Sequence, residues 1–129
     1  MAVAHSRPDL AAHQQVVHMD THAVVGALLE LLGAKLVSYI GGVTETRAAR
    51  QWLDGTREVR PDVQARLREA LTVALTIASK DEPRVVQAWF QGLNPQLEDR
   101  SPSRLLREGA LDKVGPEVRQ AARAFVVGG

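Results

Sequence analysis

Between Thr21 and Ser79 the apolar residues of this chain recur every three to four positions, which is the spacing of one face of an α-helix. The sequence shows no stretch in which apolar and polar residues alternate, as they do along a half-buried strand. Proline and glycine divide the chain into short segments, because proline suits the first position of a helix and glycine the position after its end. These features predict an all-α fold.

The proline and glycine positions also predict where each helix begins and ends. We expect helices over residues 21–32, 34–40, 44–54, 61–79, 83–91, 102–108 and 116–127. Residues 1–19 lack a steady period and contain Arg7-Pro8-Asp9, so we expect a mobile N-terminal arm there. The rest of the chain is predicted to form a helix-turn-helix bundle over residues 20–80 and a small helical C-terminal domain over residues 81–129.

The composition limits the classes of function. The chain has 129 residues, of which 45% are hydrophobic and 24% charged, and this balance is ordinary for a folded domain. Cysteine is absent, which excludes disulfides, thiolate metal sites and cysteine nucleophiles. No apolar run is long enough to cross a membrane, and the N-terminus does not have the pattern of a signal peptide. We therefore expect a cytoplasmic protein with no membrane association.

Groups suited to catalysis are sparse. The four histidines His5, His13, His18 and His22 are all near the N-terminus, the serines are distant from them in sequence, and no glycine-rich phosphate loop occurs. His18 and His22 have the spacing of two metal ligands on one helix face, but only Asp20 lies between them and no third ligand is evident. We expect neither enzyme activity nor a bound metal or cofactor.

The positive charge is concentrated in one segment. The formal net charge is +1, yet residues 33–80 hold eight lysines and arginines against five acidic residues, an excess of three. An excess of this size is often no more than a solvated helix face. It supports nucleic-acid binding only where it coincides with a suitable motif.

Residues 34–53 have the organisation of such a motif. A short helix at 34–40 is followed by a turn at Gly41-Gly42-Val43 and by a second helix that begins at Thr44, which is the order of a helix-turn-helix. Trp52 falls on the apolar face of the second helix, where we expect it in the core. Glu45 opposes phosphate binding unless it accepts a hydrogen bond from a cytosine amine or stabilises the start of the helix.

We expect the outward side chains of this segment to contact double-stranded operator DNA. Arginine suits guanine through its two parallel N–H groups, whereas small polar side chains reach phosphates or base edges. For an isolated pair of arginines, a merely solvated surface is the alternative interpretation. The residues predicted to bind DNA are Thr44, Thr46, Arg47, Arg50, Gln51, Arg57 and Arg60.

The C-terminal half contains an apolar cluster rich in aromatic residues. Its members are Val86, Trp89, Phe90, Leu93 and Leu97, and Asn94-Pro95 is expected to form a turn beside them. Such a cluster is either core or the edge of a protein interface.

Two motifs in the chain resemble known families. The pattern Leu36-Val-x-Tyr39-Ile40-x-Gly42-Val43-x-x-Thr46-x-x-Arg50-x-Trp52-x-x-Gly55 resembles the Xre/Cro-like helix-turn-helix family. Further along the chain, Trp89, then Asn94-Pro95-x-Leu97, then Ser101-Pro102-x-x-Leu105-Leu106-x-x-Gly109 resembles the toxin-binding domain of the Xre/MbcA/ParS antitoxins. The two motifs follow each other in that family's domain order.

This resemblance implies an antitoxin of a type II toxin-antitoxin pair. Members of the family dimerise, repress their own operon and neutralise a RES-domain toxin that consumes NAD. A solitary transcriptional regulator without a toxin is the alternative. Residues 24–32, apolar on several sides, are the expected homodimer surface. The residues implied to face the toxin are Trp89, Phe90, Asn94, Pro95, Leu97, Pro102, Leu105, Leu106 and Phe125.

Overall fold

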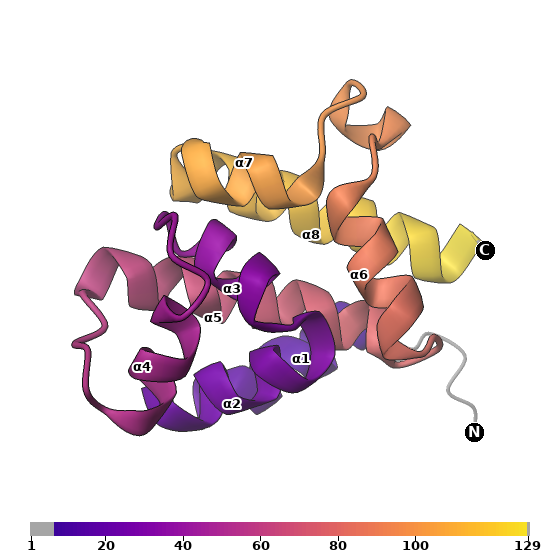
Figure 1. The fold of residues 1–129 in the computed structure, drawn as a ribbon. Coiled ribbons are helices and arrows are strands. Elements are labelled where there is room, and N and C mark those ends of the chain that lie inside the picture. Colours follow the sequence, from indigo (N-terminus) through magenta and orange to yellow (C-terminus); the bar gives the residue numbers. More distant parts are fainter. Residues whose placement is uncertain (1–6, 129) are drawn as a thin grey trace.

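A computed structural model describes residues 7–128 of the chain, and this part of the chain is helical throughout with no strand (Figure 1). The α-helices are α1 (Pro8–Val17), α2 (Thr21–Leu32), α3 (Ala34–Ile40), α4 (Ala48–Asp54), α5 (Pro61–Ala78), α6 (Pro83–Gln91), α7 (Pro102–Glu108) and α8 (Leu111–Gly128), and a 3-10 turn, η1, covers Pro95–Leu97. The predicted all-α fold is confirmed. None of the described helices combines the length and the apolar character that a membrane span requires.

The start and stop residues explain why most helices lie where the sequence predicts them. The Asp20 carboxylate accepts a hydrogen bond from the Ala23 N–H at 2.8 Å and so caps α2. Proline occupies the first position of α5, α6 and α7, where its missing N–H costs no hydrogen bond. Gly33, with φ of 85°, separates α2 from α3 in a backbone conformation that favours glycine.

The predicted mobile arm is wrong for the residues that the structure describes. Pro8 is the first residue of α1, and the next N–H groups bond to the Arg7 carbonyl, so Arg7-Pro8 starts a helix instead of preventing one. Ala12 and Val16 are buried, and Arg68 of α5 donates to the Val16 carbonyl at 3.1 Å. The prediction for residues 1–6, which include His5, lies outside the described residues.

Two other helix starts differ from the prediction. α4 begins at Ala48 and not at Thr44, because residues 44–47 form bends and turns before the helix. α8 begins at Leu111, five residues before its predicted start, and Pro116 lies inside it. The N–H groups of Lys113 and Val114 bond to the Ala110 carbonyl, so the first turn is already formed before the proline is reached.

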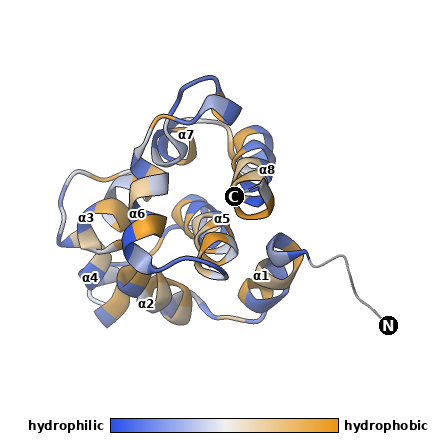
Figure 2. Cartoon of the chain, turned by 90° about the vertical axis from the view of Figure 1, so that its right-hand side faces the viewer, coloured by the Kyte–Doolittle hydropathy of each residue, from blue (hydrophilic) through white to orange (hydrophobic). Residues whose placement is uncertain are grey.

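α5 lies in the middle of the molecule. Figure 2 looks approximately along its axis, and helices α1, α2, α3, α6, α7 and α8 all contact it. The sequence predicts one apolar face on this helix, but the structure also buries Thr72, Val73, Thr76 and Ile77. α5 is therefore enclosed by other helices along its C-terminal half.

The two predicted domains share one hydrophobic core. The cluster of buried side chains runs from Val16 to Val126 and includes members of every α-helix. Polar contacts also cross the predicted boundary at residue 80, since Gln87 donates to the Leu31 carbonyl at 3.1 Å. Residues 81–128 thus pack as the second half of one domain.

The apolar surplus of α2 is used inside this core. Val24, Val25, Leu28 and Leu32 are buried, and the flanking leucines of the helix are partly buried against the same cluster. The breadth of its apolar surface therefore needs no second subunit to explain it. The homodimer stays a prediction.

An ion pair joins α5 to α8 beneath the surface. Glu69 Oε2 lies 2.9 Å from Arg119 Nε, but the N–H does not point along the line between them, so the contact is not a hydrogen bond. Burial raises the pKa of the Glu69 carboxyl above its ordinary value of 4.5, and the nearby charges of Arg119 and His13 oppose this only in part. The ionised Glu69 is therefore disfavoured by folding.

This raised pKa predicts a pH dependence of stability. The carboxyl binds its proton more tightly in the folded state, so its contribution to stability is largest below its ordinary pKa and is lost as pH rises from there through the raised value. The unfolding free energy, measured by urea denaturation from about pH 4 to about pH 7, should fall less steeply with pH in Glu69→Gln than in the native protein. The exposed Glu117→Gln serves as the control, and identical pH profiles in all three proteins would contradict the prediction.

Candidate nucleic-acid interface

The proposed helix-turn-helix consists of α3, residues 41–47 and α4. The connection has seven residues, which is longer than the three to four of a compact helix-turn-helix. Trp52 of α4 is buried and lies against the start of this connection, where a Cβ on Gly41 would be only 2.4 Å from Trp52 Cη2. Gly41 has an ordinary helical φ, so glycine is needed here for the close approach of the indole and not for its backbone conformation.

Ser38 of α3 joins the two helices through its hydroxyl. The hydroxyl donates to the Thr46 carbonyl at 2.9 Å and accepts from the Ala49 N–H at 3.1 Å. The second bond satisfies one of the free N–H groups in the first turn of α4. Because Ser38 is itself buried, α4 is held in a fixed position relative to α3.

Two arginines from other helices hold the carbonyl groups of the turn. Arg66 of α5 donates to the Gly41 carbonyl at 2.9 Å. Arg107 of α7 donates through Nη1 to the carbonyls of Tyr39 at 2.6 Å and Val43 at 3.1 Å, and its guanidinium lies 4.6 Å from the Tyr39 ring centre. Hydrogen bonds from charged donors are stronger than neutral ones, so the path of the turn is set from outside the motif.

The structure leaves most of the predicted DNA-binding side chains accessible. Arg47 is the residue before α4, Arg50 lies within its first turn, and neither has an ion pair among the described residues. Five of the seven residues are exposed and two are half-buried. The exposed ones are Thr44, Thr46, Arg47, Arg50 and Arg60, and the half-buried ones are Gln51 and Arg57.

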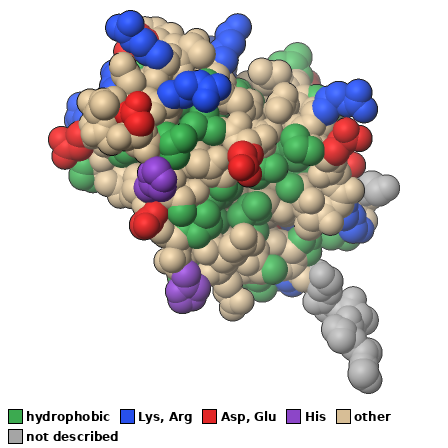
Figure 3. Space-filling model, turned by 60° about the horizontal axis from the view of Figure 1, so that its bottom comes forward, with side chains coloured by type: hydrophobic (Ala, Val, Ile, Leu, Met, Phe, Trp, Pro, Cys, Tyr) green, Lys and Arg blue, Asp and Glu red, His purple; other side chains and the backbone are tan. Residues whose placement is uncertain are grey.

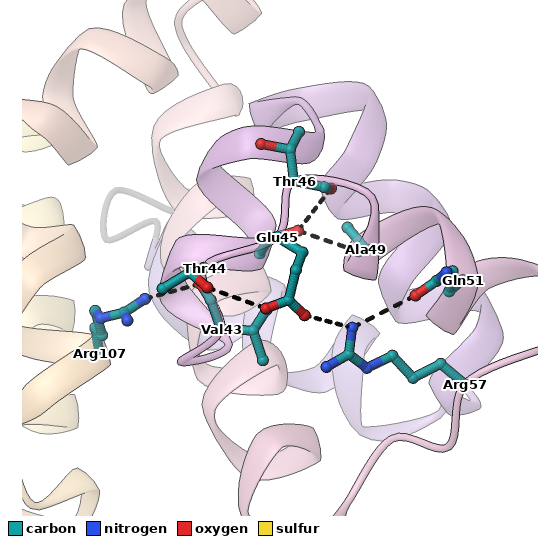
Figure 4. A network of polar contacts seen from close by, with 9 residues as sticks. Val43, Thr44, Glu45, Thr46, Ala49, Gln51, Arg57 and Arg107 are labelled. Atoms are coloured by element: carbon teal, nitrogen blue, oxygen red, sulfur yellow. Dashed lines mark hydrogen bonds and ion pairs between the residues drawn. The ribbon is translucent and has the colours of Figure 1, made fainter.

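Arg57 is engaged inside the site. Its Nη1 lies 3.0 Å from Glu45 Oε1 and 3.4 Å from Gln51 Oε1, and Thr44 donates to the other Glu45 oxygen (Figure 4). The Arg57 hydrogen bond, followed by that of Thr44, lowers the pKa of the Glu45 carboxyl. Within the described chain the Glu45 carboxylate accepts hydrogen bonds from Arg57 and Thr44 and from no N–H group of α4, so it does not cap the start of this helix. This pairing also reduces the positive charge that Arg57 presents.

The basic excess of residues 33–80 is smaller at the surface than in the sequence. Arg66 and Arg68 are half-buried and donate to backbone carbonyls, and Lys80 lies 3.5 Å from the Val126 carbonyl. Arg60 lies 3.6 Å from Asp62. On the face shown in Figure 3, basic and acidic side chains are interspersed with apolar ones and form no continuous basic field. Binding to DNA would therefore depend on a few positioned arginines.

Most residues implied to face a toxin are instead core residues. Trp89 is 9% exposed and packs edge-on against Phe90 at 5.5 Å between ring centres. The structure contradicts the prediction that these side chains face a partner for those that are buried, because a buried side chain offers a partner little surface. Trp89 and Leu97 are accessible only where they line cavities. The buried ones are Trp89, Phe90, Leu97, Pro102, Leu105 and Leu106.

The accessible apolar surface of this half lies elsewhere. Leu93, which the sequence places in the aromatic cluster, is 74% exposed, and Val127, near the end of α8, is 64% exposed. Phe125 and Pro95 are exposed and Asn94 is half-buried. Leu93, Asn94, Pro95 and Phe125 line a cavity of about 380 Å³ between α6, η1 and α8. Leu93 precedes the 3-10 turn and is exposed, whereas Leu97 at its end is buried.

The two histidines that have metal-ligand spacing do not share a helix face. His18 is the residue after α1 and His22 lies in α2, so the two are not on one helix and the spacing of four has no meaning there. Within residues 7–128, no group of three or more potential metal ligands is found.

Comparisons with protein-family models, with curated proteins and with solved structures found no match to this chain.

Replacing Gly41 tests the packing of the turn. Gly41→Ala should destabilise the protein by about 1–3 kcal/mol, because the added methyl group collides with the Trp52 ring. The matched variant is Gly26→Ala in α2, where the new methyl meets only Leu53 Cδ1 at an ordinary 3.5 Å. Since alanine favours a helix interior, this variant should be more stable by about 0.5–1 kcal/mol. Urea denaturation measures the unfolding free energy of both variants. If Gly41→Ala is as stable as the native protein, Trp52 does not constrain position 41.

Proposed function

We propose that this protein binds double-stranded DNA through α4 and the connection before it, and that it regulates transcription by doing so. The observation that carries the proposal is the position of Arg47 and Arg50. Both side chains are exposed at the start of α4 and have no ion pair among the described residues, on a helix that Ser38 and Trp52 fix to the core. A guanidinium in this position is available for the bidentate contact with guanine.

The rigidity of the motif supports the same proposal. Binding costs less when the recognition elements are already ordered, and here Arg66 and Arg107 order the turn from outside. Thr46 is exposed on that turn and can donate to a phosphate, whereas the exposed Thr44 can do so only if its hydroxyl leaves Glu45. Arg57 can add a phosphate contact only if it leaves Glu45, so we assign it a smaller part.

The arginine pair provides the direct test. Binding to sites selected by the native protein from fragmented genomic DNA is measured by fluorescence anisotropy at fixed salt. Arg47→Ala with Arg50→Ala should lose about 2–6 kcal/mol of specific binding free energy, at about 1–3 kcal/mol for each base contact. Thermal stability should change little because both side chains are exposed.

The control for this test is Arg84→Ala with Arg123→Ala, which removes the same charge from exposed positions on α6 and α8. If both double variants weaken binding equally, net charge and not a recognition site is responsible. Unchanged affinity in Arg47→Ala with Arg50→Ala would refute the interface.

We further propose that the DNA-binding protein is the antitoxin of a toxin-antitoxin pair whose toxin is of the RES class. The observation that favours a protein partner is the apolar surface beside the cavity between α6, η1 and α8, where Leu93 and Phe125 are both exposed, because exposed apolar surface marks interaction sites. Val127, near the end of α8, is a further exposed apolar side chain. This surface takes the place of the buried motif residues that the family resemblance indicated. A solitary regulator remains the alternative function.

Co-expression with a RES-domain protein encoded in the same operon tests this second proposal. The native chain should retain that protein through size-exclusion chromatography, and Leu93→Glu with Val127→Glu should lose it, because two charges would be buried at the interface. Val17→Glu on α1 is the control, since Val17 is also an exposed apolar residue at 58%. Elution of the native chain without the RES-domain protein would favour the solitary regulator.

A further inference from the structure

A cavity of about 610 Å³ opens between α3, the connection to α4, the end of α6 and α7. This volume is within the range of sites that hold small molecules. Its apolar wall is formed by Leu36, Tyr39 and Val43, and its polar wall includes Lys35 and Ser103, which have no role in the DNA-binding proposal, together with Arg107. These polar residues decide what kind of molecule the cavity suits.

Ser103 is the most informative of them. The residue is only 5% exposed, yet its hydroxyl makes no hydrogen bond to any of residues 7–128. The hydroxyl oxygen is not among the polar atoms sealed from solvent and Ser103 lines the cavity, so the hydroxyl is accessible from that space. A ligand in the cavity can therefore form a hydrogen bond with it.

The charges around the cavity favour an anion. Lys35 and Arg107 both line it, and the one acidic residue in the wall, Glu108, is paired with Arg104 at 3.1 Å. Arg107 uses Nη1 for the turn carbonyls, while its Nε and Nη2 make no hydrogen bond within the described chain and are not sealed from solvent. These two N–H directions have the geometry that guanidinium uses for carboxylate or phosphate.

We propose that this cavity is a binding site for a small organic anion. Its carboxylate or phosphate group lies between Lys35, Arg107 and Ser103, and its flat apolar body lies against Leu36 and Tyr39. The site is built from side chains of α3 and α7 and does not require that the protein bind DNA.

The position of the cavity gives the ligand a means of regulation, and this part rests on the proposed DNA-binding function. Arg107 holds the Tyr39 and Val43 carbonyls, and Thr44 and Thr46, which are predicted DNA contacts, also line the cavity. An anion bound to the free N–H groups of Arg107 therefore changes how firmly this arginine holds the turn that carries both threonines.

Isothermal titration calorimetry without DNA tests the site by itself. The probes are benzoate and phenyl phosphate as anions and benzamide as an uncharged molecule of the same shape. At least one anion should bind with a Kd of about 1 mM or tighter, and Lys35→Ala should weaken it about tenfold. Ser103→Ala should weaken it severalfold. Arg84→Ala, which removes an exposed arginine on α6, should bind as the native protein does.

Three results would overturn the proposed site. They are the absence of binding by either anion at about 10 mM, equal binding of benzamide, and equal affinity in Lys35→Ala and Arg84→Ala. The proposed site would also be overturned if a selected DNA duplex displaces phenyl phosphate and Lys35→Ala weakens DNA binding. The cavity would then bind a phosphate of the DNA backbone and not a small organic anion.

The regulatory part is tested by repeating the anisotropy measurement of DNA binding with the bound anion present. The anion should change the DNA affinity of the native protein, and in Ser103→Ala the same change should require a higher anion concentration, by the factor by which the calorimetric Kd rises. Binding of the anion with no change in DNA affinity would overturn the regulation and leave the site intact. A protein that binds no DNA at all would refute the proposed function without affecting the calorimetric result.

Discussion

The burial of α5 is the constraint on which the rest of this fold depends. Along its C-terminal half nearly every side chain is covered, including the polar Thr72 and Thr76. Their hydroxyls donate to the carbonyls of Arg68 and Thr72, one turn earlier in the helix, so they enter the core without unpaired donors. Six other helices can then pack directly against α5, and a core of this kind cannot be divided at residue 80 without exposing it. The predicted DNA-binding half and the predicted partner-binding half are therefore not independent domains.

The candidate DNA interface depends on that shared core. The connection between α3 and α4 is long for its motif, and its carbonyls are held by Arg66 from the central helix and by Arg107 from the C-terminal half. Without these two arginines, the carbonyls of Tyr39, Gly41 and Val43 would lose charged donors. The position of Arg47 and Arg50 consequently depends on contacts with α5 and α7 as well as on the motif itself. A ligand or partner that binds α7 can affect the turn through Arg107.

The sequence predicts this fold best where one residue decides the local structure. Proline correctly predicts the starts of α5, α6 and α7, and the same reasoning applied to Pro8 would have predicted α1. For α8 the rule gives the wrong start, because this helix begins before Pro116. The candidate site was predicted less well. Exposure of Arg47 and Arg50 follows from helical periodicity, whereas the pairing of Arg57 with Glu45 depends on contacts between residues twelve apart that no local pattern encodes. The use of Arg66 and Arg107 as backbone donors depends on tertiary packing in the same way.

The burial of the C-terminal motif changes what a resemblance to antitoxins supports. Trp89, Leu97 and Leu106 lie in the core, so a shared pattern at these positions specifies how α6, η1 and α7 pack. The left-handed backbone at Glu98 and Asp99 completes the turn that places Leu97 inside while Leu93 stays outside. A residue pattern that maintains packing can be common to proteins with different partners, because recognition depends on the exposed positions between the pattern residues. In this chain Leu93 is an exposed apolar position between the pattern residues, and Phe125 and Val127 are exposed after them on α8. A preference for one partner over another would therefore have to come from such exposed side chains and not from the buried pattern residues.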